Sequence, residues 1–170
     1  MKKTLSLLLA LLLALGMTPV FAEDAADALS WWDVYPDVEA LGFAGDYYTL
    51  DGVGVAFWIP ASLHPLETDA TYEDTLALAA FETEYGDKAL VICFYPLEEE
   101  NAGETPEGTS LTINGIPAYA VTAEDCFSVC FPAEGGYVLA FNFYPADDYV
   151  FSAMARVIAS SVQPYSGAEE

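Results

Sequence analysis

Basic residues are almost absent from this chain. Its 170 residues include four Lys and Arg against 27 Asp and Glu, which gives a formal net charge of -23 at pH 7. Nucleic-acid binding depends on cations that neutralise phosphates, so this composition excludes it. An anionic lipid surface is disfavoured for the same reason. Disorder is also disfavoured, because 54% of the residues are hydrophobic and a chain of this length can bury a core.

Histidine is represented once, by His64, and the motifs of common catalytic and metal sites are missing. No G-x-S-x-G sequence accompanies the histidine, so the pattern gives no support for a hydrolytic triad. Neither zinc-site spacing nor an EF-hand loop is present. The densest acidic clusters, residues 69–74 and 98–101, are interpreted as a solvated anionic surface. We therefore predict a non-enzymatic protein with no cofactor and no specific metal site.

Long apolar runs are lacking except at the N-terminus. Lys2 and Lys3 precede a Leu-rich run over residues 5–15, and Pro19 and Ala22 follow it. This order is typical of a secretory signal peptide, here residues 1–22 with cleavage after Ala22. An uncleaved anchor is the alternative, since residues 5–22 approach the length of a membrane span. We expect an exported protein, secreted or held in the cell envelope, with no membrane span after cleavage.

Only three cysteines are present, and an odd number in an exported chain leaves at least one unpaired. Cys126 and Cys130 lie four residues apart, roughly 13 Å along a strand, which is too far for a disulfide. Cys93 lies in an apolar run and can pair across a sheet with Cys126 or Cys130. The alternative is three buried thiols that act as small apolar residues.

Turn residues at short intervals divide most of the chain into predicted strands. Asp51-Gly52 and Asn114-Gly115 each join two apolar runs and fit two-residue type I′ hairpin turns. Gly86-Asp87 and residues 134–136 mark two further reversals. Pro117 has no N–H to donate, so its strand is expected to lie at an edge or a bulge there.

Phenylalanines gather on one face of the predicted sheet. Residues 126–131 alternate, with Phe127 and Phe131 opposite Cys126 and Cys130, and residues 137–144 alternate in the same way. An amphipathic stripe then predicts a helix over residues 147–162, formed by Val150, Phe151, Met154, Val157, Ile158 and Ser161. This helix is expected to cover the phenylalanines, which gives an α+β fold with an antiparallel sheet of about six to eight strands.

Residues 23–43 are predicted to form an N-terminal arm or short helix, with one helical turn from Pro36 to Leu41. Trp31 and Trp32 lie in this arm, outside the predicted core strands. They either dock the arm onto the fold or offer a platform to a ligand or partner. Residues 44–164 form one predicted globular domain, and residues 165–170 a disordered acidic tail. Residues 69–84 fit either one helix or a short helix followed by a strand.

Three runs carry a resemblance to a known group: AGDYYTLDGVGVAFWIP, LTINGIPAYAV and GGYVLAFNFYPADDYVFSAMARVIASSVQP. They resemble uncharacterised small secreted bacterial proteins with a PsbP-like α/β/α fold, over residues 44–164. The resemblance implies an antiparallel sheet flanked by helices. It also implies that residues 77–84 form a strand paired with residues 89–95. PsbP-like proteins act mainly as scaffolds and binding partners, and no functional motif carries over to particular residues.

We therefore predict an exported, non-enzymatic, acidic interaction domain. Its partner is an unknown protein or envelope component, and the net charge favours a cationic one. One alternative is a carbohydrate- or peptide-binding module that uses the exposed aromatic residues Trp31 and Trp32. The other is a small hydrolase that depends on two carboxylates.

Overall fold

The structure is a computed structural model that describes residues 27–68, 71–72, 75–96 and 108–166. The predicted signal peptide with its cleavage at Ala22 lies outside these ranges. So do the last four residues of the predicted tail and most of the two acidic clusters at residues 69–74 and 98–101.

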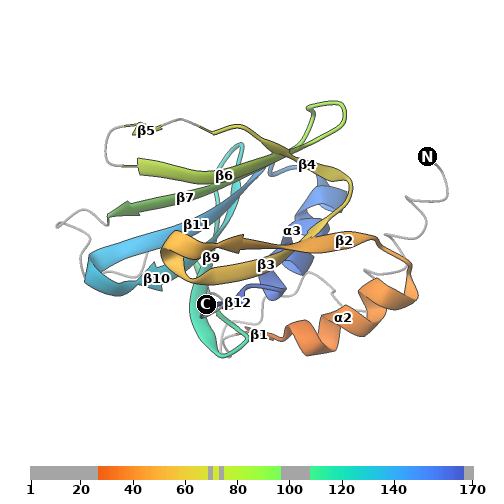
Figure 1. Ribbon diagram of the computed structural model, residues 1–170, viewed down its shortest axis with the longest axis horizontal. Helices are drawn as coiled ribbons and strands as arrows, with labels where there is room; N and C mark the ends of the chain where they lie inside the picture. Colours follow the sequence, from red (N-terminus) through yellow and green to blue (C-terminus); the bar gives the residue numbers. More distant parts are fainter. Residues whose placement is uncertain (1–26, 69–70, 73–74, 97–107, 167–170) are drawn as a thin grey trace.

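Nine strands of the described chain form a large sheet (Figure 1). They follow the order β1-β8-β9-β10-β11-β7-β6-β4, and β5 pairs with β6. All neighbouring strands are antiparallel except β1 and β8. Their bounds are β1 (Asp27–Leu29), β4 (Leu63–Leu66), β5 (Thr71–Tyr72), β6 (Thr75–Thr83), β7 (Ala89–Pro96), β8 (Thr109–Ile113), β9 (Ile116–Thr122), β10 (Phe127–Ala133) and β11 (Tyr137–Tyr144).

A separate small sheet has the order β12-β3-β2 and is formed by β2 (Gly45–Leu50), β3 (Val55–Pro60) and β12 (Gln163–Pro164). The type I′ turn predicted at Asp51-Gly52 is wrong. A 3-10 turn, η1 (Asp51–Val53), joins β2 to β3, and the left-handed residue is Gly54, with φ of 64°. The prediction at Asn114-Gly115 is confirmed, since φ is positive at both residues.

Helix α3 (Tyr149–Ser160) confirms the amphipathic helix predicted for residues 147–162, with ends two residues inside those bounds. Its first turn is capped by Asp148, whose carboxylate accepts a hydrogen bond from the Phe151 amide at 2.8 Å. Buried residues recur along one side, and the largest are Phe151, Val157 and Ile158. Val150 and Met154 are half-buried and pack beside Ala153.

Helix α2 (Trp31–Ala40) corrects the prediction of one turn beginning at Pro36, because Pro36 lies inside the helix. Trp31, Val34 and Val38 recur at three- and four-residue steps and are all buried. Pro36 has no N–H, so the Trp32 carbonyl lacks the hydrogen-bond donor that a helix normally supplies four residues later. The free energy gained by burying this stripe outweighs the loss of that hydrogen bond.

Residues 75–83 form β6, which pairs with β7 through a turn containing Gly86, so the strand implied by the resemblance is confirmed. The pairing of β9 with β10 ends at Tyr119, before it reaches Pro117. At Pro117, β9 therefore has a neighbouring strand on one side only, as predicted. His64 lies in edge strand β4 opposite Glu82.

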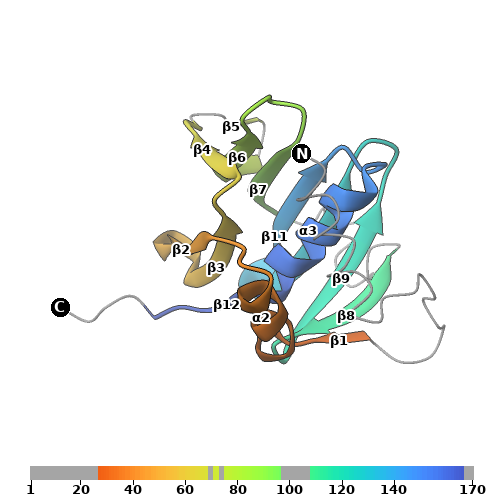
Figure 2. The same ribbon diagram turned by 90° about the vertical axis from the view of Figure 1, so that its right-hand side faces the viewer.

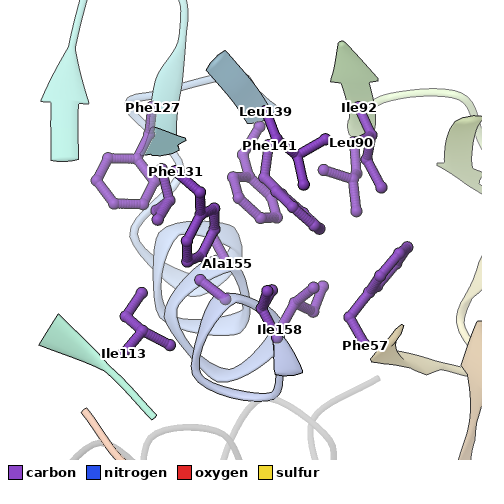
Figure 3. Close-up of a cluster of buried hydrophobic side chains, with 14 of the residues drawn as sticks. Phe57, Leu90, Ile92, Ile113, Phe127, Phe131, Leu139, Phe141, Ala155 and Ile158 are labelled. Carbon is purple, nitrogen blue, oxygen red and sulfur yellow. The ribbon is translucent and has the colours of Figure 1, made fainter. Parts of the chain in front are cut away.

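The elements stack in three layers, with both described helices on the same side of the large sheet (Figure 2). The phenylalanine-lined face of the large sheet packs against α3, as the sequence pattern predicts, and also against β3. Figure 3 shows Ala155 and Ile158 of α3 pointing into the space between Phe57 of β3 and the rings of β10 and β11. Helix α2 forms the third layer, where its buried stripe contacts Trp58 and Val157.

Candidate functional site

Two adjacent tryptophans of α2 have opposite environments. Trp31 is 2% exposed and packs on Trp58, with ring centroids 5.9 Å apart. Trp32 is 76% exposed. The two alternatives predicted for the tryptophan pair therefore apply to different residues. Trp31 docks the N-terminal segment onto the fold, and Trp32 is exposed to solvent.

Trp31 is held at its position by a residue that the sequence analysis identified only as part of a turn. The side-chain oxygen of Asn114 accepts a hydrogen bond from the Trp31 amide at 2.8 Å. The Asn114 amide nitrogen donates to the carbonyls of Ser160 and Val162, each at 2.7 Å. One side chain thus joins the start of α2 to the end of α3, and it fixes where α2 presents its outer face.

Two tyrosines border Trp31 on the molecular surface. Tyr35 is 37% exposed, and its ring centroid lies 5.3 Å from that of Trp31. Tyr47 of β2 is 49% exposed, and its hydroxyl accepts a hydrogen bond from the Trp31 indole N–H at 2.5 Å. Burial raises the pKa of Tyr47 above its ordinary value, so the phenol stays neutral at physiological pH.

We call Trp32, Tyr35 and Tyr47 the aromatic surface. Trp32 and Tyr35 are three residues apart on α2 and so are neighbours on the helix. The buried ring of Trp31 contacts the rings of both Tyr35 and Tyr47, and so connects Tyr47 of β2 with the residues of α2. An exposed carboxylate, Asp33, follows Trp32 in α2. Aromatic faces beside carboxylates favour cations, since both present negative potential.

The described chain contains one lysine and one arginine, and the lysine is paired with carboxylates outside the aromatic surface. Lys88 binds Asp87 at 2.9 Å and Asp148 at 3.0 Å. These hydrogen bonds raise the pKa of Lys88. Arg156, the other basic residue of the described ranges, belongs to α3. The aromatic surface itself is formed by uncharged rings, and the acid Asp33 follows Trp32 in the helix.

The three cysteines lie on the face of the large sheet that points away from α3. Cys93 of β7 lies opposite Ala140, and Ala140 lies opposite Cys130, so β11 separates the two cysteines. Two strand spacings are about 9.6 Å, beyond the Cα distance of a disulfide. All three cysteines are free thiols in the structure.

Burial makes two of these thiols poor nucleophiles. Desolvation raises the pKa of Cys130 to about 11, and it also raises the pKa of Cys93. The reactive thiolate is therefore scarce at neutral pH. The Cys126 thiol lies 3.3 Å from the Ser128 hydroxyl, which donates to the Asn142 side-chain oxygen at 2.7 Å. These contacts tie the polar side chains of the face to one another.

The strand order keeps His64 away from Cys126 and Cys130. Strand β4 is four places from β10 in the large sheet, which corresponds to roughly 19 Å. His64 thus has neither Cys130 nor Cys126 beside it as a nucleophile. Across the described ranges, no three His, Cys, Asp or Glu side chains gather closely enough to hold a metal ion. The helices in those ranges are too short or too polar to span a membrane.

A cleft between the two sheets is the feature that the sequence analysis missed. It has a volume of about 510 Å³ and is lined mainly by apolar side chains of both sheets, among them Val53, Val55, Phe94, Ile116, Phe131 and Leu139. Gly52 and Glu134 lie in the two turns at its margin. In the sequence these residues read as ordinary strand and turn positions, so no local signal marks the cleft.

No protein-family model matches the chain, and no curated protein sequence matches it. Among solved structures, the chain is similar to the solution structure of cyanobacterial PsbP (CyanoP) from Synechocystis sp. PCC 6803, with 12% identity and a TM-score of 0.50. The match covers 72% of this chain and 93% of the other. The fold is therefore PsbP-like, in agreement with the resemblance seen in the sequence.

Proposed function

We propose that this protein is an exported, non-enzymatic binding domain whose aromatic surface docks a cationic protein or envelope component. The observation that carries the proposal is the exposure of Trp32 on a helix whose neighbouring tryptophan is buried. Exposed tryptophan and tyrosine side chains are the residues that most often dominate binding energy at protein interfaces.

The support beneath the aromatic surface favours binding over chance exposure. Trp31 contacts Trp58, Tyr35 and Tyr47, and Asn114 holds its backbone. Such a rigid platform loses little conformational entropy when a partner docks, so more of the contact energy appears as affinity.

Charge supports a cationic partner. The formal net charge is -23, and exposed Asp33 follows Trp32 in α2. Long-range attraction would speed the encounter with a basic partner, and cation–π contacts with Trp32 would add short-range selectivity. Export rests on the leader pattern of residues 1–22 and is tested by the mass of the secreted chain, which is expected to begin at Glu23.

The test is a pull-down from the envelope fraction of the producing cell, followed by binding to the purified captured component. Trp32→Ala is expected to weaken binding at least tenfold, since a central aromatic anchor typically supplies more than about 1.4 kcal/mol. Tyr85→Ala is the matched control, because Tyr85 is 84% exposed on the β6–β7 turn, away from α2. Raised salt is expected to weaken binding as well.

Capture that survives Trp32→Ala, or that is lost equally in Tyr85→Ala, would place the partner elsewhere and overturn the assignment to the aromatic surface. Turnover of a glycoside or ester that is abolished by one Asp or Glu substitution would overturn the non-enzymatic assignment.

Carbohydrate binding is the second candidate, favoured by the placement of exposed Trp32 and Tyr35 on one helix face. Sugar rings stack on such side chains without needing charge. A glycan array distinguishes the two: glycan binding that depends on Trp32 and is insensitive to salt would favour the carbohydrate, whereas salt-sensitive binding of a basic partner favours the first proposal.

A further inference from the structure

We propose that the inter-sheet cleft is a second binding site, which takes a linear alkyl chain carrying a quaternary ammonium head group. The site is separate from the aromatic surface. It lies between the large sheet and the small sheet, beside the turns η1 (Asp51–Val53) and η3 (Glu134–Gly136).

The shape and lining of the cleft suit an alkyl chain. Its volume of about 510 Å³ falls in the range of pockets that hold small organic ligands. Phe94, Ile116 and Leu139 line it from the large sheet, and Val55 of β3 and Val53 of the turn η1 line it from the other side. A sugar or another strongly polar ligand would lose its hydration there without gaining hydrogen bonds. An apolar chain gains by leaving water.

The charge at the margin selects the head group. Glu134 is the one charged residue among the described residues that line the cleft. Tyr137 follows it closely, is exposed, and stacks on Phe94 with ring centroids 4.9 Å apart and planes 4° from parallel. A carboxylate beside an aromatic ring favours a quaternary ammonium group. A carboxylate or phosphate head group would face Glu134 and the negative field of the whole chain.

Gly52, in the turn η1, leaves room at the margin of the cleft. A side-chain carbon added at Gly52 would meet no atom within 4 Å, and the φ of Gly52 lies outside the left-handed region. A larger residue at Gly52 is therefore accommodated with no backbone strain, and because Gly52 lines the cleft, a phenylalanine ring there can reach the cleft mouth. This property makes Gly52→Phe a blocking variant that leaves the core intact.

Calorimetry on the full mature chain tests the site with three ligands of equal chain length: decyltrimethylammonium, decanol and decanoate, each below its micelle concentration. We expect one decyltrimethylammonium per chain, weaker binding of decanol and the weakest binding of decanoate. Shortening the alkyl chain is expected to lower affinity about fourfold per methylene. Gly52→Phe is expected to abolish binding of all three.

Glu134→Gln is expected to weaken decyltrimethylammonium binding about two- to fivefold, the range of one exposed charge pair, and to leave decanol unchanged. Glu124→Gln is the matched control, since Glu124 is exposed near the opposite end of β10 and the change in net charge is the same. Equal losses in both variants would show attraction to the overall charge alone and would overturn the proposed head group.

Methyl NMR on the unmodified chain gives a readout that does not depend on a variant folding. Decyltrimethylammonium is expected to shift the methyl signals of Val53, Val55 and Ile116 and to leave those of Val121 and Val150 unmoved. Shifts spread over the whole chain, wild-type binding by Gly52→Phe, or decanoate binding as tightly as the cation would each overturn the proposal. A dimer that is lost in Gly52→Phe would assign the cleft to a second copy and would also overturn it.

Discussion

The space between the two sheets is filled in one region and open in the next. Along the inward face of β11, Phe141 and Phe143 are fully buried, while Leu139 lines the cleft. The filled region is the one where α3 inserts Ala155 and Ile158 (Figure 3). Where the helix has ended and the chain continues toward β12, Val162 is buried at the edge of the cleft, and the space beyond it stays open. The buried side chains of α3 thus fill the space between the two sheets where the helix runs.

The largest expected effect comes from emptying the filled region. Phe141→Ala is expected to lower the free energy of unfolding by about 3–5 kcal/mol, because it removes a fully buried ring and leaves a cavity. Val53→Ala at the cleft is expected to cost less than about 1 kcal/mol, since its side chain is only half-buried. Urea unfolding measures both. Equal losses would mean that the cleft is packed like the core.

Asn114 links the two regions, because it binds α2 and the end of α3 beside Val162, a cleft residue. Asn114→Ala is expected to cost about 2–4 kcal/mol through three lost hydrogen bonds and a left-handed backbone that alanine disfavours. Asn114→Gly is the control: it keeps the turn and removes the hydrogen bonds. The difference between the two variants in urea unfolding isolates the backbone contribution; no difference would contradict it.

Ser161 fixes the end of α3 against the small sheet. Its buried hydroxyl accepts a hydrogen bond from the Trp58 amide at 2.8 Å and donates to the Ile158 carbonyl. Ser161→Ala is expected to cost about 1–3 kcal/mol in thermal unfolding, because the Trp58 N–H then lacks its partner. The same change at half-buried Ser152, whose hydroxyl donates to the Ala146 carbonyl at 3.2 Å, is expected to cost less. A reversed order would contradict the importance of this junction.

The smallest expected effect concerns pH and the first turn of α3. Burial alone would raise the pKa of Asp148, yet hydrogen bonds from Phe151 and Lys88 lower it overall. The charged form therefore stabilises the fold above the unfolded pKa of about 3.9, and this contribution is lost as pH falls through the lower folded value. Asp148→Asn keeps the cap and loses the charge.

Asp148→Asn is thus expected to be less stable than wild type by about 0.5–1 kcal/mol at neutral pH, with the difference vanishing in acid. Urea unfolding at several pH values measures this difference. A stability difference between the two proteins that grows in acid would contradict the lowered pKa of Asp148. High salt is the control, since it is expected to shrink the neutral-pH difference through screening.

Local periodicity predicted part of the core, while Ala79 and Phe81 of β6 lie in a stretch whose period left helix and strand open. Alternation over residues 126–131 and 137–144 identified the inward faces of β10 and β11, and the stripe around Val157 identified α3. The candidate site was predictable only in part. The sequence marked Trp31 and Trp32 as a pair, but Tyr47 looked like an ordinary strand residue, and the cleft lining looked like core.

The amino-acid sequence by itself determined the acidic charge, the strand and helix periods, and the apolar faces that must be buried, because these follow from side-chain chemistry and backbone geometry. Only the tertiary structure decided that the β2–β3 hairpin leaves the large sheet, that Trp31 is buried while Trp32 is not, and that a cleft remains beyond α3. Each of these depends on how separate elements meet, since residues distant in sequence compete for the same buried space.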